Sequence, residues 1–458
     1  MNIPTVMEPD FNKIEQRAWD VLRMNNRGTH TVPSSGHKNT KHEMYGHSWL
    51  WDGAAHAIGI AHRDPRFAAT ELDHILQAQW QNGMVPHMRF RDGSLDRYYW
   101  MAHILHPHSH DSIHSSGITQ PPVLADAVQR VSRRMEGDDD RRAFVDNALG
   151  RLIRYHEWIY AERDPAGNGG MVTLHPWEHG HDNSPRSIEP LREYENSALG
   201  MAVRGLYSVI HLFRRDLKNA PAEQRASRDA ARLMTQNFIS LLVAGYDIDK
   251  IRGHIPLHED VHMTSVLARN NQVLTELALE SGVTLPESLR ENMARTIDNF
   301  ESMRDPTTGL YLNKDSETGK LIPIVTSASL EPLAVADQLP PEHVDKLVQH
   351  LRDPKSFGLR YGLPSVPKDS PYYRQYEYWS GAAWTYPEWI IADGLERAGH
   401  HDVARDIAAL SIKRASYSDF HEYASPETAE GCGAPNFSWT AAQTIDHIRR
   451  FYPESQAI

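Results

Sequence analysis

Apolar residues recur at intervals of three and four along most of the chain, which is the spacing of one face of an α-helix. Leu124, Val128, Val131 and Met135 follow this rule. The pattern predicts helices over about 10–25, 52–63, 67–80, 124–135, 149–160, 195–216, 221–244, 258–281, 286–303, 344–351, 381–398, 402–415 and 437–450. Pro340-Pro341 is a start signal just before one of these segments.

The segments between these helices are rich in Trp, His, Pro and Gly, and few of them alternate as strands do. Met88-Arg89-Phe90 is a short stretch that could pair as a minor strand. No Gly/Ser linker, low-complexity tract or internal repeat divides the chain. We therefore predict a single catalytic domain over residues 1–458, an all-α toroid whose loops build a site at one mouth.

Composition narrows the class of protein. The chain has 458 residues, of which 40% are hydrophobic, and its net charge of -12 comes with no long basic stretch. Nucleic acid and membranes are therefore not expected partners, and no apolar run approaches the roughly 20 residues that cross a bilayer. The first residues lack the basic leader and apolar core of a secretory signal, so we expect a cytoplasmic protein. A homo-oligomer stays possible.

Aromatic, carboxylate and amide side chains gather in four clusters between the predicted helices or at their ends. The clusters are 45–52 with 79–87, 117–122, 175–186, and 377–384 with 420–423 and 437–442. Hydrolysis of a sugar needs a protonated carboxylic acid, an ionised carboxylate and aromatic faces for the pyranose. Asp182 near Trp177 is a candidate for the acid, because an apolar neighbour disfavours the charged form. Asp-Asn-Ser-Pro is equally a plain turn signal.

Taken together, these segments resemble glycoside hydrolase family 63, especially its bacterial branch of mannosylglycerate and glucosylglycerate hydrolases. The matching motifs run in order from about residue 45 to residue 445. They are Trp-x-Trp-Asp, Gln-Trp-x-Asn-Gly-Met-x-Pro-His, Gly-Ile-Thr-Gln-Pro-Pro, Trp-Glu-x-Gly-x-Asp-Asn-Ser-Pro-Arg, Tyr-Trp-x-Gly-x-x-Trp and Phe-Ser-Trp-Thr-Ala-Ala.

The resemblance implies an (α/α)6 barrel and hydrolysis with inversion at the anomeric carbon, without a metal or organic cofactor. By motif, Asp182 matches the general acid and Glu422 the general base, although Glu427 and Glu430 lie close by. The candidates for sugar contact are Tyr45, Trp49, Trp51, Asp52, Gln120, Trp177, Arg186, Tyr378, Trp379 and Trp384. We expect Trp49, Trp80 and Trp439 to be core residues more readily than residues that face the ligand.

Three departures from the family pattern bear on the substrate. The chain passes quickly from Ser187 into what reads as a helix, where the glycerate-releasing members carry a longer loop. Gly381 to Thr385 replaces the more usual Gly-Pro-Val-Trp-Pro, and His179 and His181 stand where Ser and Met are commoner. We expect an α-glucoside or α-mannoside substrate, and mannosylglycerate, glucosylglycerate and an α-linked disaccharide all stay open.

A second interpretation is a zinc metallohydrolase, because His258, Glu259 and His262 fit the pattern His-Glu-x-x-His. On a helix this spacing would place both histidines on one face, with Glu276 or Glu280 as a third ligand. The ordinary interpretation is a helix start with solvated histidines.

Three further features stay open. His106, His108, His110 and His114 form a loop that could bind a transition metal weakly or contact the aglycone, although a polar loop is the ordinary interpretation. Cys432 is the only cysteine, so it forms no internal disulfide, and a small turn residue fits it better than a nucleophile. A catalytically inactive sugar-binding protein on the same fold is the third class of function.

Overall fold

The computed structural model describes residues 10–35, 45–91, 108–110, 112–195, 201, 228–252 and 255–453. Apart from residues 195 and 201, the predicted helix over 195–216 lies outside the described residues, as do the first residues of the one over 221–244 and His106.

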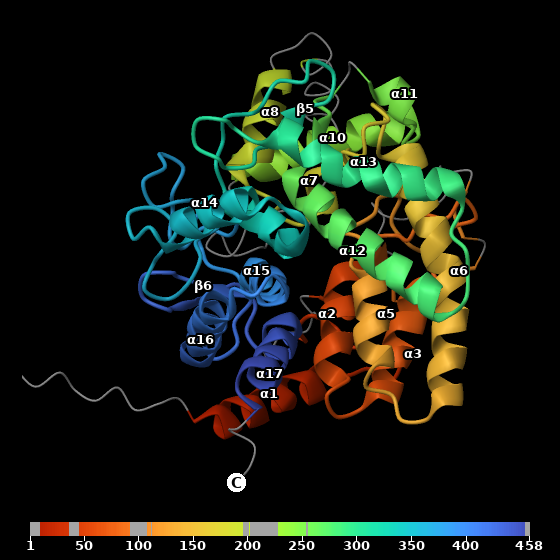
Figure 1. Ribbon diagram of the computed structural model, residues 1–458. Helices are drawn as coiled ribbons and strands as arrows, with labels where there is room; N and C mark the ends of the chain where they lie inside the picture. The colour runs from red at the N-terminus through yellow and green to blue at the C-terminus, as the bar shows by residue number, and fades with distance from the viewer. Residues whose placement is uncertain are drawn as a thin grey trace, which may run out of the picture.

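Six helical elements form a closed inner ring. They are α2 (Leu50–Ile60), α5 (Leu124–Ser132), α12 (Val261–Glu280), the 3-10 helix η2 (Ser327–Gln338), α15 (Thr385–Arg397) and α17 (Ser438–Phe451). Each packs against the next in this order, and α17 returns to pack against α2 (Figure 1). The chain therefore closes a ring by bringing together two helices that are far apart in sequence.

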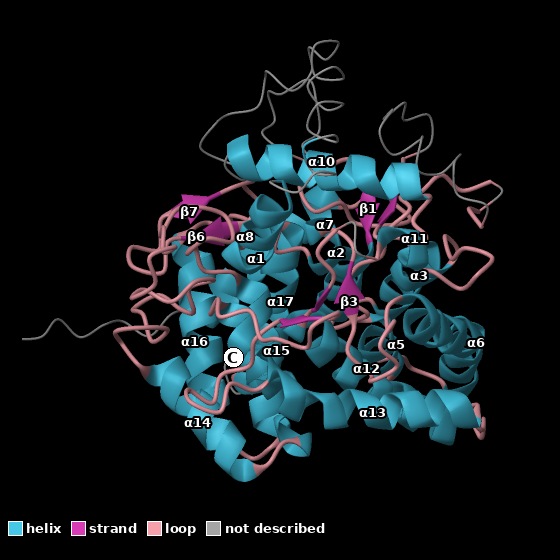
Figure 2. Ribbon diagram, turned by 90° about the horizontal axis from the view of Figure 1, so that it is seen from above, coloured by secondary structure: helices cyan, strands magenta, loops and turns pink. Residues whose placement is uncertain are grey.

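A second helix backs each member of this ring. The outer helices are α1 (Phe11–Asn25), α3 (Pro65–Leu76), α6 (Asp138–Glu162), α13 (Glu287–Met303), α14 (Pro341–Arg352) and α16 (His401–Tyr417). They pack in turn on α17, α2, α5, α12, η2 and α15, and Figure 2 shows α6, α13 and α14 along the edge of the molecule. The predicted (α/α)6 toroid is confirmed.

Burial distinguishes the two rings. Every residue of α2 is buried, whereas α14 buries only Val344, Leu347 and Leu351. An inner helix touches neighbours all around and needs no polar face, while an outer helix needs one apolar stripe. Gly59 allows the closest approach at the closure, because a Cβ there would lie 2.6 Å from the Cα of Ala442 in α17.

Short strands connect the loops at the mouth. β1 (Ser48–Trp49) pairs with β2 (Met88–Arg89), β4 (His258–Glu259) lies between β3 (Val172–Thr173) and β5 (Lys314–Asp315), and β6 (Tyr423–Ala424) pairs with β7 (Gly431–Cys432). All these pairs are antiparallel. The predicted minor strand at 88–90 is confirmed.

The strands also explain two helices that begin later than predicted. α12 begins at Val261 instead of 258, because His258 and Glu259 pair with both neighbouring strands. α15 begins at Thr385 instead of 381, because Ala383 exchanges backbone hydrogen bonds with Ala424. Neither pairing is visible in the local apolar spacing.

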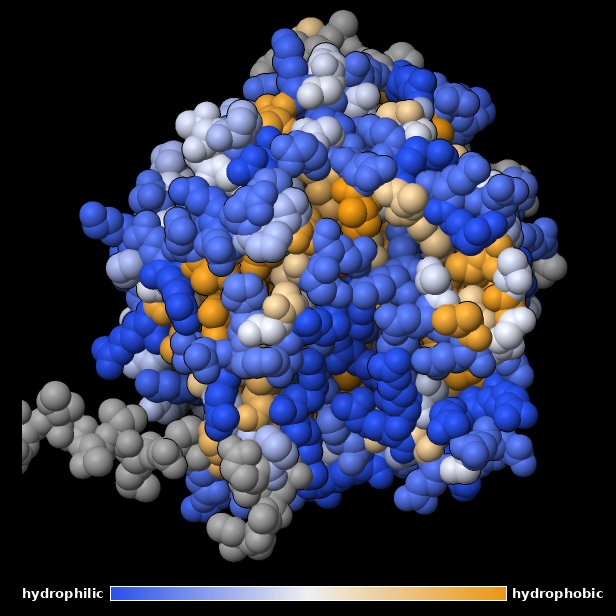
Figure 3. Space-filling model, viewed as in Figure 1, coloured by the Kyte–Doolittle hydropathy of each residue, from blue (hydrophilic) through white to orange (hydrophobic). Residues whose placement is uncertain are grey.

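Among the described residues, four more helices lie outside the two rings: α7 (Pro176–His179), α8 (Pro185–Glu195), α10 (Arg228–Ala244) and α11 (Ile248–Ile251). α8 packs on α10, and α10 on α11. None of the described helices is long and apolar enough to cross a membrane. The face in Figure 3 is mostly hydrophilic, and its apolar residues show as small separate areas.

Candidate active site

The predicted site residues gather where the inner elements begin. Trp51 and Asp52 lie in the first turn of α2, Gln120 precedes α5, and Trp384 is the residue just before α15. The backbone amide of Trp51 donates to the side-chain oxygen of Gln120 at 3.2 Å, which joins the starts of α2 and α5. The N-terminal ends of helices carry partial positive charge, so this mouth suits oxygen-rich ligands.

Asp182 lies in the loop between α7 and α8, on the wall of the site. Burial and the nearby Glu422 carboxylate raise the pKa of Asp182 well above its usual value. Within the described part of the chain, no group donates a hydrogen bond to this carboxyl group. Gly180 lets the loop approach Trp51, because a Cβ there would lie 2.3 Å from the indole ring and its φ is +72°. The surroundings favour a protonated Asp182.

Glu422 faces the same site from the start of the β6–β7 hairpin. One of its oxygens accepts hydrogen bonds from the hydroxyls of Tyr45 at 3.1 Å and Tyr378 at 3.2 Å, and the other accepts from the backbone N–H of Ala434 at 3.0 Å. Burial raises the pKa of Glu422 and these three donors lower it. The balance is a pKa of about 7. Donors aimed at a carboxylate favour its ionised form.

Tyr45 and Tyr378 were predicted as sugar contacts, and the structure places both against Glu422. Ala434 was not predicted. Its amide reaches the carboxylate because Gly433 has no side chain: a Cβ there would lie 2.6 Å from Glu422 Oε2, at a φ of +73°. In the sequence, the only signal for this contact was the glycine that follows Cys432.

Asp52 is the third carboxyl group of the site. It is buried, and burial raises its pKa to about 6, partly offset by His56. Its charge also contributes to the raised pKa of Glu422. Trp51 beside it packs edge-on against Trp439, at 4.7 Å between ring centroids.

Trp379 and Trp384 are buried and stacked on each other, with centroids 4.2 Å apart. His181 covers the other face of Trp379 at 3.8 Å, and Tyr423 covers the other face of Trp384 at 4.7 Å. Both rings therefore have their faces occupied by protein. They were predicted as sugar contacts, and that role stays a prediction; what the structure shows is their stacking between His181 and Tyr423.

Arg186 is also buried, below the mouth. Its guanidinium forms an ion pair with Asp260, donates to Asn313 Oδ1 at 3.3 Å and donates to His181 Nδ1 at 3.1 Å. Asp260 also accepts from the amide of Met263 at 3.1 Å, as the N-cap of α12. Arg186 therefore attaches the Asp182 loop to the start of α12.

The remaining predicted aromatic residues lie around the rim. Trp177 packs against His175 at 4.4 Å and Phe238 of α10 at 5.7 Å between centroids. Trp49, in β1, is half-buried and packs edge-on against Tyr45 at 5.5 Å. Trp80 and Trp439 are buried in the core, as expected from the sequence.

The structure does not support the zinc-hydrolase interpretation. His258 and Glu259 belong to strand β4, and His262 to α12, so the two histidines do not share a helix face. Glu259 pairs with Lys314 at 2.8 Å and accepts from Asn168 at 2.9 Å. A helix does start here, at Val261 instead of 258, and the expectation of solvated histidines is wrong, since both are buried.

One other group has the composition of a metal site. His181, His262 and Glu331 of η2 bring ligand atoms within 4.8 Å of one another, and all three are buried. However, the two imidazole rings stack at 4.5 Å and 26°. Nitrogen lone pairs lie in the ring planes, so those of stacked rings run nearly parallel and do not converge on one point. Arg186 donates to His181, and His262 is hydrogen-bonded to Glu331. The Nε2 atoms of both histidines and Oε1 of Glu331 have no hydrogen-bond partner among the described residues.

The histidine-rich loop and the cysteine are also placed. The Nδ1 of His110 accepts from the amides of Ser112 and Ile113 at 3.1 and 3.0 Å, so it holds a local turn. Cys432 lies in β7, not in a turn as predicted, and burial raises the pKa of its thiol to about 11. A thiol with a raised pKa is a poor nucleophile at neutral pH.

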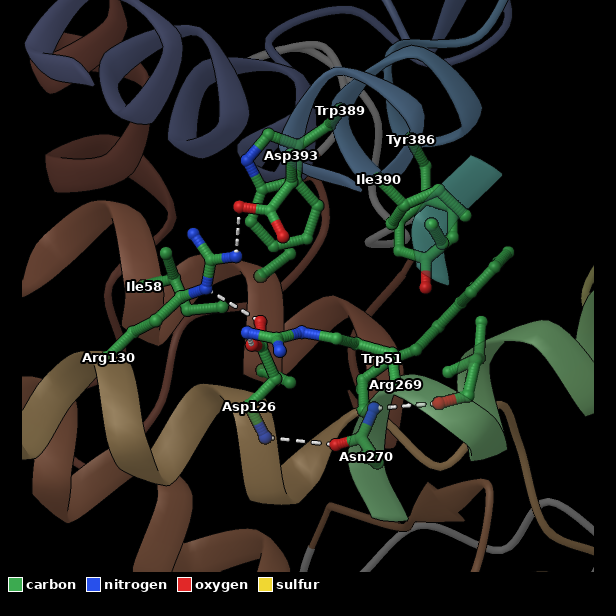
Figure 4. Close-up of a pocket in the computed structure, with 15 residues that line it drawn as sticks. Trp51, Ile58, Asp126, Arg130, Arg269, Asn270, Tyr386, Trp389, Ile390 and Asp393 are labelled. Carbon is green, nitrogen blue, oxygen red and sulfur yellow. Dashed lines mark hydrogen bonds and ion pairs between the residues drawn. The ribbon is translucent and has the colours of Figure 1, made fainter. Parts of the chain in front are cut away.

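A small cavity of about 30 Å³ lies behind Trp51, between inner helices of the ring. Figure 4 shows Trp51 and Tyr386 on one side of it and Asp126, Arg130 and Asp393 on the other. Arg130 pairs with both carboxylates at 2.6 Å. The volume suits one or two waters and is too small for a sugar.

Comparison with known proteins agrees with this arrangement. Residues 45–440 match the mannosylglycerate hydrolase MGH1-like glycoside hydrolase domain. Mannosylglycerate hydrolase MGH2 of Selaginella moellendorffii is 31% identical over 95% of this chain and 86% of its own length. Glucosylglycerate hydrolase of Mycolicibacterium hassiacum is 30% identical, over 96% of this chain and 99% of its own.

A solved structure gives the same result. The GH63 mannosylglycerate hydrolase of Thermus thermophilus, in complex with Tris and D-glycerate, superposes with a TM-score of 0.81. Its sequence is 30% identical, and the match covers 95% of this chain and all of the other. The toroid, the paired carboxyl groups and the matching motifs agree: the chain belongs to the MGH1-like mannosylglycerate hydrolase family of glycoside hydrolases, within glycoside hydrolase family 63.

Proposed function

We propose that this enzyme hydrolyses a small α-glycoside of glycerate, mannosylglycerate or glucosylglycerate, with inversion at the anomeric carbon. The observation that carries the proposal is the contrast between two carboxyl groups in one site. Asp182 is held protonated by burial and by the charge of Glu422, whereas Glu422 receives three hydrogen bonds that favour its ionised form. Two carboxyl groups whose surroundings separate their protonation states are the requirement for acid and base catalysis.

In this mechanism Asp182 gives its proton to the glycosidic oxygen as the bond to the anomeric carbon breaks. Glu422 accepts a proton from a water molecule, which attacks the anomeric carbon from the opposite face. The products are the β-anomer of the free sugar and the released glycerate. In this proposal Asp52 and Gln120 bind sugar hydroxyls, and Trp51 forms one wall of the pocket.

The substrate proposal rests on the relatives, which are named for mannosylglycerate and glucosylglycerate. The experiment is sugar release from mannosylglycerate, glucosylglycerate, kojibiose, nigerose and trehalose, with proton NMR following the first anomer. We expect the β-anomer to appear first from one of the two glycerate compounds. First release of the α-anomer would contradict inversion, and release from a disaccharide alone would contradict the glycerate assignment.

The two roles are tested by substitution. Asp182→Asn and Glu422→Gln should each lower kcat by about 10²–10⁴-fold, because each removes a proton-transfer group and little volume. Circular dichroism should show the folded protein in both cases.

Glu427→Gln is the matched control, since Glu427 lies five residues from Glu422 but pairs with Lys368 at the surface. It should keep the wild-type rate. Wild-type turnover in Glu422→Gln, together with loss in Glu427→Gln, would move the base to Glu427.

A further inference from the structure

Five aromatic rings stack in a single column through the wall of the site. In order they are His262, His181, Trp379, Trp384 and Tyr423, with successive centroids 4.5, 3.8, 4.2 and 4.7 Å apart. The angles between successive ring planes are 26°, 17°, 4° and 24°. No ring in the column is more than 3% exposed. The column is therefore a continuous, buried contact between separate segments of the chain.

The column joins the chain segments that carry the two carboxyl groups. His181 immediately precedes Asp182, and Tyr423 immediately follows Glu422. Trp379 and Trp384 fill the space between them, and His262 anchors the far end on the inner helix α12.

Hydrogen bonds fix the same segments side by side. The side chain of Asn183 accepts from the amide of Trp379 at 2.8 Å, and the hydroxyl of Ser380 donates to the carbonyl of Asn183 at 3.1 Å. These contacts attach the Asp182 loop to the Trp379 segment.

On the other side, the indole of Trp384 donates to the carbonyl of Tyr378 at 3.0 Å, and the Tyr378 hydroxyl donates to Glu422. The segments that carry the two carboxyl groups are thus each attached to the tryptophan pair in the middle of the column.

We propose that this column is a spacer that sets the separation of the two carboxyl groups, and that His181 is the positioning residue for Asp182. The proposal rests on the proposed function, in which the groups act on opposite faces of the sugar. An inverting site needs its carboxyl groups roughly 6.5–9.5 Å apart, to admit one water. Stacked rings resist compression as closely packed cores do, and a misplacement of about 1 Å can cost about 10²-fold in rate.

The test compares two substrates that differ only in their need for the acid. A glycerate leaving group must be protonated as it departs, whereas fluoride in the corresponding α-glycosyl fluoride departs without a proton from Asp182. Both need the water activated by Glu422. A displaced acid therefore slows only the glycoside, and a displaced base slows both.

His181→Ala removes the ring at the acid end of the column. We expect its kcat on the glycoside to fall by about 10²-fold, with the rate on the glycosyl fluoride reduced less than about threefold. His181→Phe restores a ring of similar size and should recover most of the glycoside rate. Trp384→Leu opens the column at the base end and should lower both rates.

The control is Trp158→Phe, which reduces a buried ring stacked on Tyr155 at 6.1 Å in α6, outside the column. It should leave the ratio of the two rates unchanged. Equal losses on both substrates in His181→Ala, or no recovery in His181→Phe, would overturn the spacer. Failure of the proposed function would show separately, as glycoside turnover by Asp182→Asn.

Discussion

The protonation of Glu422 depends on a balance between burial and three hydrogen bonds. Burial alone disfavours the carboxylate, and the donors from Tyr45, Tyr378 and Ala434 oppose it, leaving a pKa of about 7. A general base works only when ionised, so the free enzyme should lose activity as the pH falls through about 7. The raised pKa of Asp182 sets the opposite limit, since the acid must keep its proton.

Tyr378→Phe should shift the acidic limb of the pH profile to higher pH. The substitution removes a donor that favours the ionised form, so the pKa of Glu422 rises. A hydrogen bond to a charged group contributes about 1.5–3 kcal/mol, which corresponds to a shift of about one pH unit or more.

The measurement is kcat/KM against pH for the wild type and the variant. Tyr361→Phe, which alters a tyrosine outside the site, is the control and should keep the wild-type profile. A limb that stays in place in Tyr378→Phe would show that this hydroxyl does not stabilise the carboxylate.

The same residues show how far the sequence alone could go. The motif around Asp182 and the position of Glu422 identified the pair of carboxyl groups that the structure brings together. The motifs also named Trp379 and Trp384, but assigned them to the sugar. An aromatic residue in a motif does not reveal which partner covers its ring faces, because those partners, His181 and Tyr423, come from distant segments.

At the scale of elements, the apolar spacing predicted the outer helices other than α6 well because each buries one stripe. It gave α6 only from residue 149, whereas the helix begins at Asp138 with a first turn of acidic residues that carry no apolar signal. It missed η2, whose Pro332 interrupts the helical pattern and which follows 3-10 geometry. A 3-10 helix in the inner ring depends on its contacts with α12 and α15.

Asp260→Asn should destabilise the start of α12 and the Asp182 loop together. Asparagine still caps a helix, so the main loss is the charge that balances the buried Arg186. Removing one partner of a buried ion pair costs about 3–5 kcal/mol. Urea unfolding should show this as a reduced midpoint.

Asp140→Asn breaks a surface pair between Asp140 and Arg66 at 3.0 Å and is the control. Its effect should stay below about 1 kcal/mol. Equal effects of the two substitutions would show that the Arg186–Asp260 pair does not hold the loop.

At the scale of the molecule, the toroid depends on one junction where α17 packs against α2. Gly59→Ala should weaken this junction, because the new Cβ would lie 2.6 Å from the Cα of Ala442. Overpacking of this kind costs about 1–3 kcal/mol. If the chain is one domain, calorimetry should show a single transition displaced to lower temperature.

Gly150→Ala is the matched control, since Gly150 is exposed in the middle of α6 and its nearest neighbour is a side-chain atom at 4.0 Å. It should stabilise the protein by about 0.5–1 kcal/mol, through helix propensity alone. A stabilised Gly59→Ala would show that the junction can separate at little cost.

The same closure constrains the order of events during synthesis. α2 leaves the ribosome early and must wait for α17, which is made near the opposite end of the chain. At about 5–20 residues per second, the apolar inner face of α2 stays without its final neighbour for on the order of tens of seconds. Glu422 is also translated long after Asp182, so a nascent chain that ends before residue 422 holds only one of the two carboxyl groups. Hydrolysis therefore begins only after the segment with Glu422 has been made and folded, and until α17 follows, α2 has α3 and α5 as its neighbours.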